Sequence, residues 1–308
     1  MQAVRHPRFL RLDPEWSSPD RAGVIILPVP YEQTTSYIKG AAEAPGAILD
    51  ASQYLELYDE ELDAEIFRLC GGIAALPALR FDEGCRDADA VEAIRQSVQR
   101  ELDRNKMVVC IGGEHTIAIG PAQAYTERFG DISILHFDAH SDLRQVYEGS
   151  PYSHGCSMAR IYDFNRNIVQ VGIRSQGKEE ADFIKEHRIA TFYDVAIKQG
   201  RYGPGTSWHE AVIERLHDEV YITFDCDFFD PSLIPALGTP EPGGFGWDET
   251  LALLRKLSLE RRIVGFDINE LSPAPPYIHS QFIIAKLIYK LIGYIVTGRE
   301  RAQKSPAR

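Results

Sequence analysis

The sequence predicts an α/β protein built on a mainly parallel sheet of about eight strands, with helices on both faces of the sheet. Short β-branched runs recur along the chain without polar alternation, which is typical of strands buried on both faces. Segments with apolar residues at helical spacing separate these runs. This alternation of strand and helix favours right-handed βαβ units, which place successive parallel strands in one sheet.

The strands and helices are assigned from these two patterns. The expected strands are Val24–Val29, Met107–Ile111, Ile132–Phe137, Ile168–Ile173, Ile189–Tyr193, Val220–Phe224 and Ile263–Ile268, with a weaker candidate at Ile66–Cys70. In the helix expected at Asp87–Arg104, Val91, Ile94 and Val98 fall on one face. The other expected helices are Ala44–Tyr58, Ile117–Phe129, Lys178–His187, Trp208–His217, Trp247–Leu257 and Gln281–Val296.

No charge block, composition shift or low-complexity linker divides the chain, so residues 1–308 are expected to form a single domain. The segment Asp230–Gly246 is rich in proline and glycine and is long for a connection. Long loops inside compact domains are commonly functional, and this one is interpreted in that way rather than as a domain boundary.

Composition excludes some classes of function. The formal net charge of -12 argues against nonspecific nucleic-acid binding and suits a small cationic substrate or metal ions. Five cysteines without a CxxC pair argue against a disulfide framework and indicate a reducing compartment. The N-terminus lacks an apolar signal-peptide core, and the longest apolar tract, Phe282–Val296, is short for a membrane span. We therefore expect a cytoplasmic protein without a membrane partner, in which this tract is a buried or interface helix.

Titratable residues follow four of the expected strands. They are His115 after Met107–Ile111, Asp138, His140 and Asp142 after Ile132–Phe137, Asp225 and Asp227 after Val220–Phe224, and Glu270 after Ile263–Ile268. Ligand sites in open α/β sheets lie beyond the carboxyl ends of the strands. These side chains are therefore expected to converge on one site.

The two-residue spacing predicts which side chains face that site. On an extended segment, residues i and i+2 point to the same side, so Asp138 is expected to lie with His140, and Asp225 with Asp227. By the same argument Cys226 points into the core. Asp142 joins the site if the extended geometry continues, whereas His136 lies within a strand and is expected to be a hydrogen-bonded core histidine.

Four clustered carboxylates repel one another and raise one another's pKa values, so a cluster without metal is costly. Four aspartates and two histidines are too many ligands for one structural zinc ion, and they suit two ions about 3.5 to 4 Å apart. Mixed oxygen and nitrogen ligands favour Mn²⁺ over Zn²⁺ and leave Fe²⁺, Co²⁺ and Ni²⁺ open. Because such a pair of ions lowers the pKa of a bound water, the chemistry indicated is hydrolysis.

Five motifs appear in the order and spacing of one known family. They are "GGEHT", "DAHSDLR", "SHGCSMARI", "TFDCDFFDPSLIPALGTPEPGG" and "DINELSP". From about Val24 to the final helix the chain resembles the ureohydrolases, the arginase and agmatinase family. The resemblance implies a three-layer α/β/α sandwich, the arginase-like fold, with two Mn²⁺ per subunit. It also implies hydrolysis of a guanidino group to urea and an amine, and a homo-oligomer, a trimer or hexamer.

The resemblance also implies roles for individual residues. One ion is expected to bind His115, Asp138, Asp142 and Asp225, and the other Asp138, His140, Asp225 and Asp227, so that Asp138 and Asp225 bridge. His154 of "SHG" resembles the family's proton shuttle, and Glu270 resembles the carboxylate that holds the guanidinium. The motifs depart from the usual pattern at Thr116 and Ala236, and the second change bears on substrate choice.

Among guanidino substrates, the sequence favours agmatine, giving putrescine and urea. The Ser-Gly-Asn stretch by which arginases resemble one another is replaced by "YEGSPYSHG". Acidic groups near the mouth, Glu148 or Glu241, would suit a cationic tail, although Glu241 fits a loop-bracing role equally well. The alternatives are a guanidinobutyrase, guanidinopropionase, arginase or formimidoylglutamase, or a catalytically silent structural paralogue.

Overall fold

The computed structural model describes residues 8–82, 84–202 and 207–304. Its centre is an eight-stranded sheet of order β4-β1-β5-β10-β9-β6-β7-β8, in which every neighbouring pair is parallel. The strands are β1 Val24–Val29, β4 Ile73–Ala75, β5 Met107–Gly112, β6 Ser133–Phe137, β7 Ile168–Ile173, β8 Ala190–Tyr193, β9 Glu219–Asp225 and β10 Arg262–Asn269. The predicted α/β class and strand number are confirmed. The last strand in sequence, β10, lies between β5 and β9 in the middle of the sheet.

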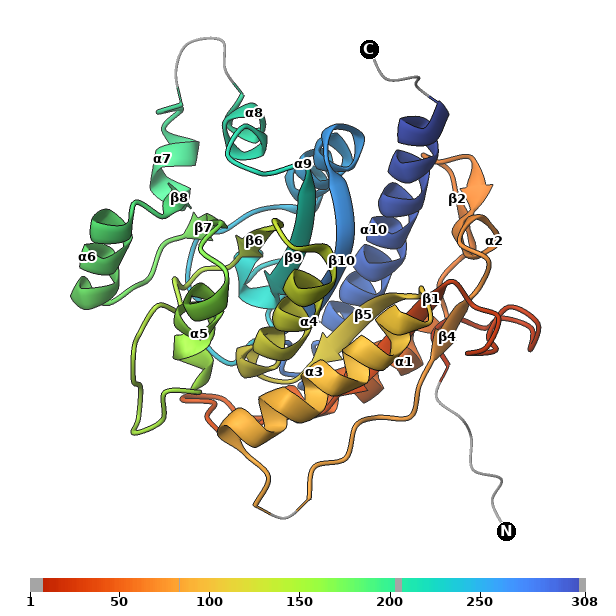
Figure 1. Ribbon diagram of the computed structural model, residues 1–308, viewed down its shortest axis with the longest axis horizontal. Helices are drawn as coiled ribbons and strands as arrows, with labels where there is room; N and C mark the ends of the chain where they lie inside the picture. Colours follow the sequence, from red (N-terminus) through yellow and green to blue (C-terminus); the bar gives the residue numbers. More distant parts are fainter. Residues whose placement is uncertain (1–7, 83, 203–206, 305–308) are drawn as a thin grey trace.

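Helices cover both faces of this sheet and make three layers (Figure 1). They are α1 Ala44–Ser52, α2 Ile66–Leu69, α3 Asp87–Asp103, α4 Ile119–Phe129, α5 Ser157–Phe164, α6 Lys178–His187, α7 Asp194–Lys198, α8 Trp208–Ile213, α9 Trp247–Glu260 and α10 His279–Lys304. One apolar core joins the sheet to α3, α4, α5 and α6, and a second joins its other face to α1, α2, α8, α9 and α10. Strands between two such layers are apolar on both faces, which is why they lack polar alternation.

The weak strand candidate Ile66–Cys70 is wrong. Ile66–Leu69 forms α2, and the eighth strand is β4, a few residues later. Gly71 and Gly72 have positive φ values of 71° and 106° and turn the chain between the two elements. A short apolar run does not distinguish a buried strand from a buried helix, and here the glycine pair marked the boundary.

Two predicted helices are also shorter in the structure. α1 ends at Ser52 rather than Tyr58, because Tyr58 begins β2 (Tyr58–Asp59), which pairs antiparallel with β3 (Ala64–Glu65). α8 ends at Ile213 rather than His217. Four short 3-10 helices complete the fold: η1 Ala41–Glu43, η2 His115–Ala118, η3 His154–Cys156 and η4 Cys226–Phe228.

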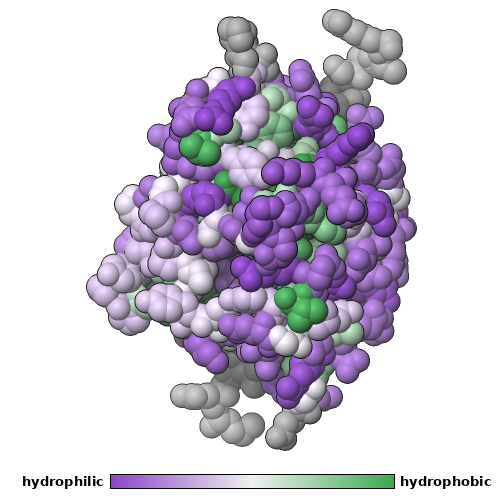
Figure 2. Space-filling view, turned by 90° about the vertical axis from the view of Figure 1, so that its left-hand side faces the viewer, coloured by the Kyte–Doolittle hydropathy of each residue, from purple (hydrophilic) through white to green (hydrophobic). Residues whose placement is uncertain are grey.

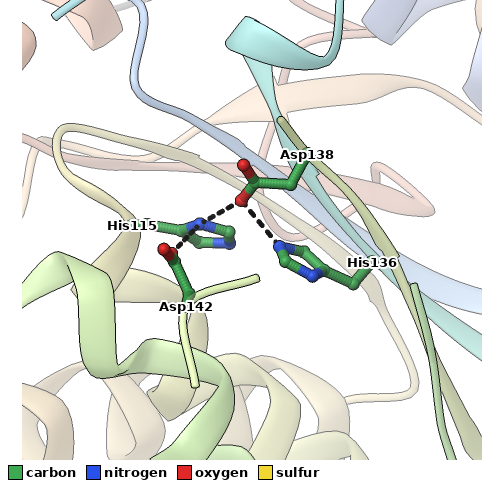
Figure 3. Close-up of side chains that lie close together, drawn as sticks. All are labelled: His115, His136, Asp138 and Asp142. Atoms are coloured by element: carbon green, nitrogen blue, oxygen red, sulfur yellow. Dashed lines mark hydrogen bonds and ion pairs between the residues drawn. The ribbon is translucent and has the colours of Figure 1, made fainter. Parts of the chain in front are cut away.

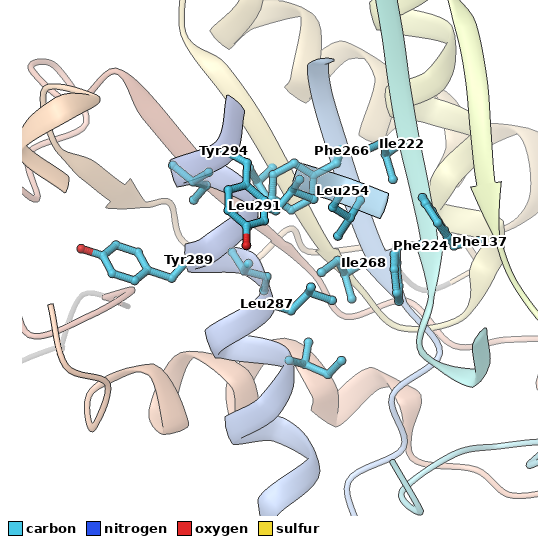
Figure 4. Packing of buried hydrophobic residues seen from close by; sticks show 14 of the residues in the cluster. Phe137, Ile222, Phe224, Leu254, Phe266, Ile268, Leu287, Tyr289, Leu291 and Tyr294 are labelled. Atoms are coloured by element: carbon cyan, nitrogen blue, oxygen red, sulfur yellow. The ribbon is translucent and has the colours of Figure 1, made fainter. Parts of the chain in front are cut away.

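The C-terminal helix α10 is longer than the apolar tract suggested. In the described part of the chain it is the one helix whose length and apolar composition would allow it to cross a membrane. However, 61% of its most apolar window is buried. Leu287, Leu291 and Tyr294 face Leu254 of α9 and Phe266 of β10 (Figure 4). The expectation of a buried helix is therefore confirmed. The argument that the tract is too short to span a membrane does not hold, because the helix is long enough.

α10 also carries a buried charge. Lys290 is 5% exposed, and its Nζ donates to both carboxylate oxygens of Asp59, at 3.1 and 3.2 Å. The same ammonium lies 2.8 Å from Glu61 Oε2. Two carboxylates on the β2–β3 hairpin thus compensate the lysine, as a buried charge requires.

The outer surface is polar where a solvent-facing surface is expected. The side of the molecule that includes α6, at the left of Figure 1, shows mostly hydrophilic residues with isolated hydrophobic ones. Single exposed apolar side chains of this kind are normal on a protein surface (Figure 2).

Candidate metal centre

The titratable cluster lies beyond the carboxyl ends of the four central strands, β5, β10, β9 and β6. His115 opens η2 just after β5, Asp138 follows β6, and Asp225 ends β9. Because these strands are neighbours in a parallel sheet, residues far apart in sequence meet at one edge. The predicted convergence of strand-end residues is found in the structure.

His115 is at the centre of the first group of side chains (Figure 3). Its Nδ1 lies 2.9 Å from Asp142 Oδ2, 3.1 Å from Asp138 Oδ2 and 3.4 Å from Asp225 Oδ2. All four residues are buried. One imidazole nitrogen therefore faces three carboxylates in a space from which water is largely excluded.

The other nitrogen of His115 determines what this arrangement can hold. Nε2 lies 3.0 Å from Thr223 Oγ1, and that hydroxyl donates to Asp267 Oδ1 at 2.9 Å. Since the only hydroxyl proton of Thr223 goes to Asp267, Nε2 is the donor to Thr223, and Nδ1 of the neutral ring is left with a lone pair. Nδ1 is buried and has no hydrogen-bond partner. A lone pair facing carboxylates is repelled unless a cation lies between them, so the donor set fits a metal ion.

A second group adjoins the first and shares Asp138 with it. His140 Nδ1 lies 2.8 Å from Asp227 Oδ2 and 3.6 Å from Asp138 Oδ1. The outer nitrogen of the same ring, Nε2, lies 3.7 Å from Glu241 Oε1. The six predicted ligands are thus brought together as two overlapping groups, which is the arrangement that two neighbouring cations need.

The pKa values of Asp225 and His115 record the crowding of negative charge around them. Burial, followed by the charges of Asp227 and Asp138, raises the pKa of Asp225 well above its usual value. For His115, burial acts to lower the pKa, but the neighbouring carboxylates of Asp138, Asp142 and Asp225 outweigh it and raise the pKa well above its usual value. Proteins relieve such clusters by protonation or by binding cations.

The backbone reaches this geometry by turns rather than by the extended segments that the sequence suggested. Asp142 has a φ of 52°, in the left-handed region, and Asp227 lies in η4. The amide of Asp227 donates to Asp225 Oδ1 at 2.8 Å, and that of Ala139 donates to Asp227 Oδ1 at 2.9 Å. Cys226 is fully buried, as predicted. The six residues thus lie together in the structure, but the alternation argument does not explain how all of them come to face one another.

His136 is buried beside the cluster and is fully hydrogen-bonded, as expected. Its Nε2 lies 2.7 Å from Asp138 Oδ2, and its Nδ1 lies 3.0 Å from Gln170 Nε2. Because the Gln170 amide can only donate, Nδ1 accepts and Nε2 donates to Asp138. His136 therefore holds the orientation of the carboxylate that the two groups share.

A cavity of about 190 Å³ opens onto the cluster, and both predicted catalytic residues line it. Glu270 has a φ of 60°, and its Oε1 accepts a hydrogen bond from the His115 amide at 2.6 Å. Burial, and then the charge of Glu114, raises the pKa of Glu270 well above its usual value. His154 enters from η3 and is contacted by a loop after β1.

The two acidic residues suggested for a cationic tail lie farther out. Glu241 reaches the edge of the cluster only through His140, and its backbone carbonyl accepts a hydrogen bond from Arg174 at 3.1 Å. Glu148 is exposed on a turn and is not among the described residues that line the cavity. The bond from Arg174 goes to the backbone of Glu241, so it does not involve the carboxylate.

Sequence reasoning missed four residues near the cavity. They are Thr34 and Ser36, which contact His154, Glu114, which lies behind them, and Arg144, which lines the wall. Thr34 and Ser36 follow β1, so the strand-end argument would have reached them if hydroxyl residues had been included. Glu114 precedes His115 in "GGEHT", but only His115 of this motif was predicted to belong to the site.

Comparison with known proteins agrees with this geometry. Residues 22–293 match the model of the arginase family. The chain is 37% identical over 284 residues to an N(1)-aminopropylagmatine ureohydrolase of Synechocystis, covering 89% of each chain, and 32% identical over 275 residues to an agmatinase of Pyrococcus horikoshii, covering 88% of this chain and 92% of that one. Its fold is similar to that of proclavaminate amidino hydrolase from Streptomyces clavuligerus, with a TM-score of 0.82, 26% identity and coverage of 95% and 97%. The chain therefore belongs to the arginase family and is a ureohydrolase that acts on guanidino C–N bonds.

Proposed function

We propose that this ureohydrolase converts agmatine and water to putrescine and urea. The observation that carries the proposal is the charge of the cavity wall. Five buried carboxylates line it: Asp142, Asp225 and Asp227 would be compensated by the metal ions, Glu180 faces Arg144, and Glu270 remains free to pair with a cationic substrate. A guanidinium with a cationic tail suits such a wall better than a substrate that carries its own carboxylate.

The one arginine or lysine among the described lining residues is Arg144, and its guanidinium already has partners. Nε lies 3.4 Å from Glu180 Oε2, Nη1 lies 3.8 Å from Glu179 Oε1, and the group stacks over the Tyr147 ring at 4.5 Å. A substrate carboxylate would have to compete with these contacts. Arginine and guanidinobutyrate would therefore leave a negative charge poorly compensated, which is expensive in a confined site.

The metal in the proposal is a pair of Mn²⁺ ions. His115, Asp138, Asp142 and Asp225 would hold one ion, and Asp138, His140, Asp225 and Asp227 the other, with the donor set described above as support. When bound, two such ions supply a water that ionises at neutral pH and positive charge for the anion that develops during hydrolysis.

The protein's own groups then perform two tasks. Glu270, a buried carboxylate at the cavity wall, accepts N–H bonds from the planar guanidinium and orients its carbon toward the metal cluster. As water adds and the C–N bond breaks, the departing nitrogen needs a proton, because an amine leaves poorly as an anion. His154 donates that proton, so that the products are neutral urea and the ammonium form of putrescine.

The name of the Synechocystis relative favours a second candidate substrate, N(1)-aminopropylagmatine. It has the same guanidinium and a longer cationic tail, so the acidic wall argument applies to it equally. The two substrates differ by an aminopropyl group, which adds length and a positive charge to the tail, and a direct comparison of rates distinguishes them.

Urea release after Mn²⁺ loading tests the proposal on a panel of agmatine, N(1)-aminopropylagmatine, arginine and guanidinobutyrate. We expect kcat/KM for agmatine to exceed that for arginine by about 100-fold, the size of an unpaired charge penalty of about 3 kcal/mol. A higher value for arginine or guanidinobutyrate would overturn the substrate assignment. H154N, with unchanged metal content, should lose about 100-fold or more in kcat.

The remaining parts of the proposal concern the cell. We place the enzyme in the cytoplasm, in polyamine biosynthesis, because putrescine is a polyamine and the cysteines are unpaired. The family resemblance supports a trimer or hexamer. Light scattering coupled to gel filtration gives the subunit number. A monomer at micromolar concentration would contradict the proposed trimer or hexamer.

A further inference from the structure

His154 is held by the loop that follows β1, through all three of its nitrogen atoms. Its backbone N–H donates to Thr34 Oγ1 at 2.9 Å, and its ring Nδ1 lies 3.2 Å from the same oxygen. Ring Nε2 lies 3.2 Å from Ser36 Oγ. The loop comes from a different strand than His154 does, so these contacts are tertiary and fix the position of the ring in the cavity.

The carboxylate of Glu114 lies behind Thr34. Its Oε1 accepts from Thr34 Oγ1 at 2.9 Å and from Thr116 Oγ1 at 3.0 Å. Its Oε2 accepts from the amides of Gln33 at 2.8 Å and Thr34 at 2.6 Å. Backbone N–H groups can only donate, so Oε2 is an acceptor. In the ionised carboxylate Oε1 accepts from Thr34, while the Thr116 hydroxyl is shared with the Tyr152 carbonyl at 2.9 Å.

The single hydroxyl proton of Thr34 decides the protonation of the histidine. A threonine hydroxyl has one proton and two lone pairs. Because the Thr34 hydroxyl donates this proton to the carboxylate of Glu114, only lone pairs of Thr34 Oγ1 face the amide and Nδ1 of His154. Ser153 Oγ also approaches Nδ1, at 3.5 Å, but the Thr34 contact is shorter, at 3.2 Å, and it is attractive only if Nδ1 bears a proton. In the neutral ring, the lone pair is therefore on Nε2.

We propose that Thr34, oriented by Glu114, is a positioning residue that keeps a proton on Nδ1 of His154 and makes Nε2 the atom that exchanges protons in the cavity. The inference rests on the proposed role of His154 as proton donor. In the charged ring, the Nδ1–H bond to Thr34 is retained while Nε2 gives up its proton to the departing amine. The proton on Nδ1 never leaves, so one hydrogen bond serves both states.

Other charged and titratable groups also face His154, and the test must separate their effects. The Tyr147 ring lies edge-on to it at 5.8 Å between centroids, and Arg144 stacks on that ring from the other side of the turn. Across the cavity lie Asp142 and Glu270. None of these groups touches Thr34 through a described hydrogen bond, so a Thr34 variant leaves them unchanged.

The experiment compares T34V, T34S and T35V in the Mn²⁺-loaded enzyme, with kcat measured against pH. T34V keeps the shape of the side chain but removes the acceptor of the Nδ1–H bond. This bond stabilises the charged ring more than the neutral ring, so its loss favours the neutral ring. The alkaline limb of the profile should move to lower pH by about one unit, and kcat near neutral pH should fall about tenfold. T34S retains the hydroxyl and should restore the limb and most of kcat.

T35V is the matched control. Thr35 lies on the same loop and contacts Glu114 Oε2 at 3.5 Å, but no described hydrogen bond joins it to His154. Its alkaline limb should stay in place. Metal content and melting temperature are measured for every variant, and T34A replaces T34V if the valine lowers the melting temperature markedly.

Each outcome has a definite meaning. If T34V or T34A keeps the wild-type limb while H154N is inactive, the inference is wrong and the proposed function stands. A T34S limb that moves as far as that of T34V would also overturn the inference, because the hydroxyl is present. If H154N retains full kcat, the proton-donor role itself fails, and the inference fails with it.

Discussion

The carboxylate of Glu270 accepts a hydrogen bond from the backbone N–H of His115 at 2.6 Å, across 155 residues of sequence. The contact joins the residue proposed to hold the guanidinium directly to the segment that carries His115, a proposed metal ligand. It uses Oε1 and fixes the orientation of the carboxylate. A guanidinium bound by Glu270 is therefore positioned relative to the cluster by the backbone itself.

Glu270→Gln tests that relationship. The amide oxygen still accepts from His115, but the negative charge that pairs with the guanidinium is lost. We expect kcat/KM for agmatine to fall by about 10- to 100-fold, the value of a charge-assisted hydrogen bond. Metal content, measured by elemental analysis, should remain that of the wild type. An E270Q enzyme within twofold of wild type would remove Glu270 from the substrate site.

Metal removal tests the donor set. The active protein should contain close to two divalent ions per chain, because two overlapping ligand groups share Asp138. Chelation should abolish urea release and lower the melting temperature, since ions that bind only the folded state stabilise it by mass action. Mn²⁺ should restore both. Full activity in protein shown by elemental analysis to be metal-free would contradict the proposal.

Three variants at the end of β9 separate bridging, terminal and core roles. Asp225→Asn should lower metal content most, because Asp225 would hold both ions and each then loses its negative charge. Asp227→Asn should mainly weaken the ion near His140. Cys226→Ala should keep both ions and cost about 1 kcal/mol of stability from a small cavity. Metal stoichiometry and urea release are measured for the three variants side by side. Metal loss in C226A alone would refute the assignment of Asp225 and Asp227 as ligands and of Cys226 as a core residue.

Thr223→Val addresses the hydrogen bond behind His115. The valine removes the acceptor of the Nε2–H bond and leaves the ring free to change tautomer. Loss of such an outer partner typically lowers metal affinity by about 10- to 100-fold. Competition with a chelator of known affinity measures it. T223S, which retains the hydroxyl, is the control, and equal affinities for T223V and wild type would contradict the tautomer argument.

Lys290 predicts an alkaline limit to stability. Burial acts to lower its pKa, but hydrogen bonds to Glu61 and Asp59 outweigh this effect and raise the pKa. A raised folded-state pKa adds stability below the unfolded value, about 10.4, and the contribution is lost as pH rises through the folded value. Lys290→Met should cost about 3 kcal/mol at neutral pH by leaving Asp59 buried without its cation, and it should flatten the alkaline loss.

Urea denaturation at several pH values measures this effect. Lys178→Met is the matched control, because Lys178 pairs with Asp182 on an exposed helix face and such pairs contribute under 1 kcal/mol. Equal losses of stability in the two variants would show that burial of the Lys290 charge has no special cost.

The fold and the metal cluster were largely predictable because both depend on local patterns. Buried parallel strands read as continuous apolar runs, and their ends identify the site edge, so His115, Asp138 and Asp225 could be named from sequence. The turn at Asp142 and the 3-10 geometry of Asp227 could not, since both are set by hydrogen bonds across the sheet edge. Thr34 was missed for the same reason. Its importance lies in contacts to Glu114 and His154, about 80 and 120 residues away, which no local pattern contains.

The position of β10 has a consequence for how the protein is made. This strand is the last of the sheet to leave the ribosome, yet it lies between β5 and β9, which hold His115 and Asp225. While the chain is being synthesised, the two halves of the nascent sheet have no shared partner strand, and their exposed edges invite wrong pairing. A chain released before Arg262 would carry all six proposed metal ligands and still lack the strand that joins β5, and with it His115, to the β9–β6 pair that positions the other five.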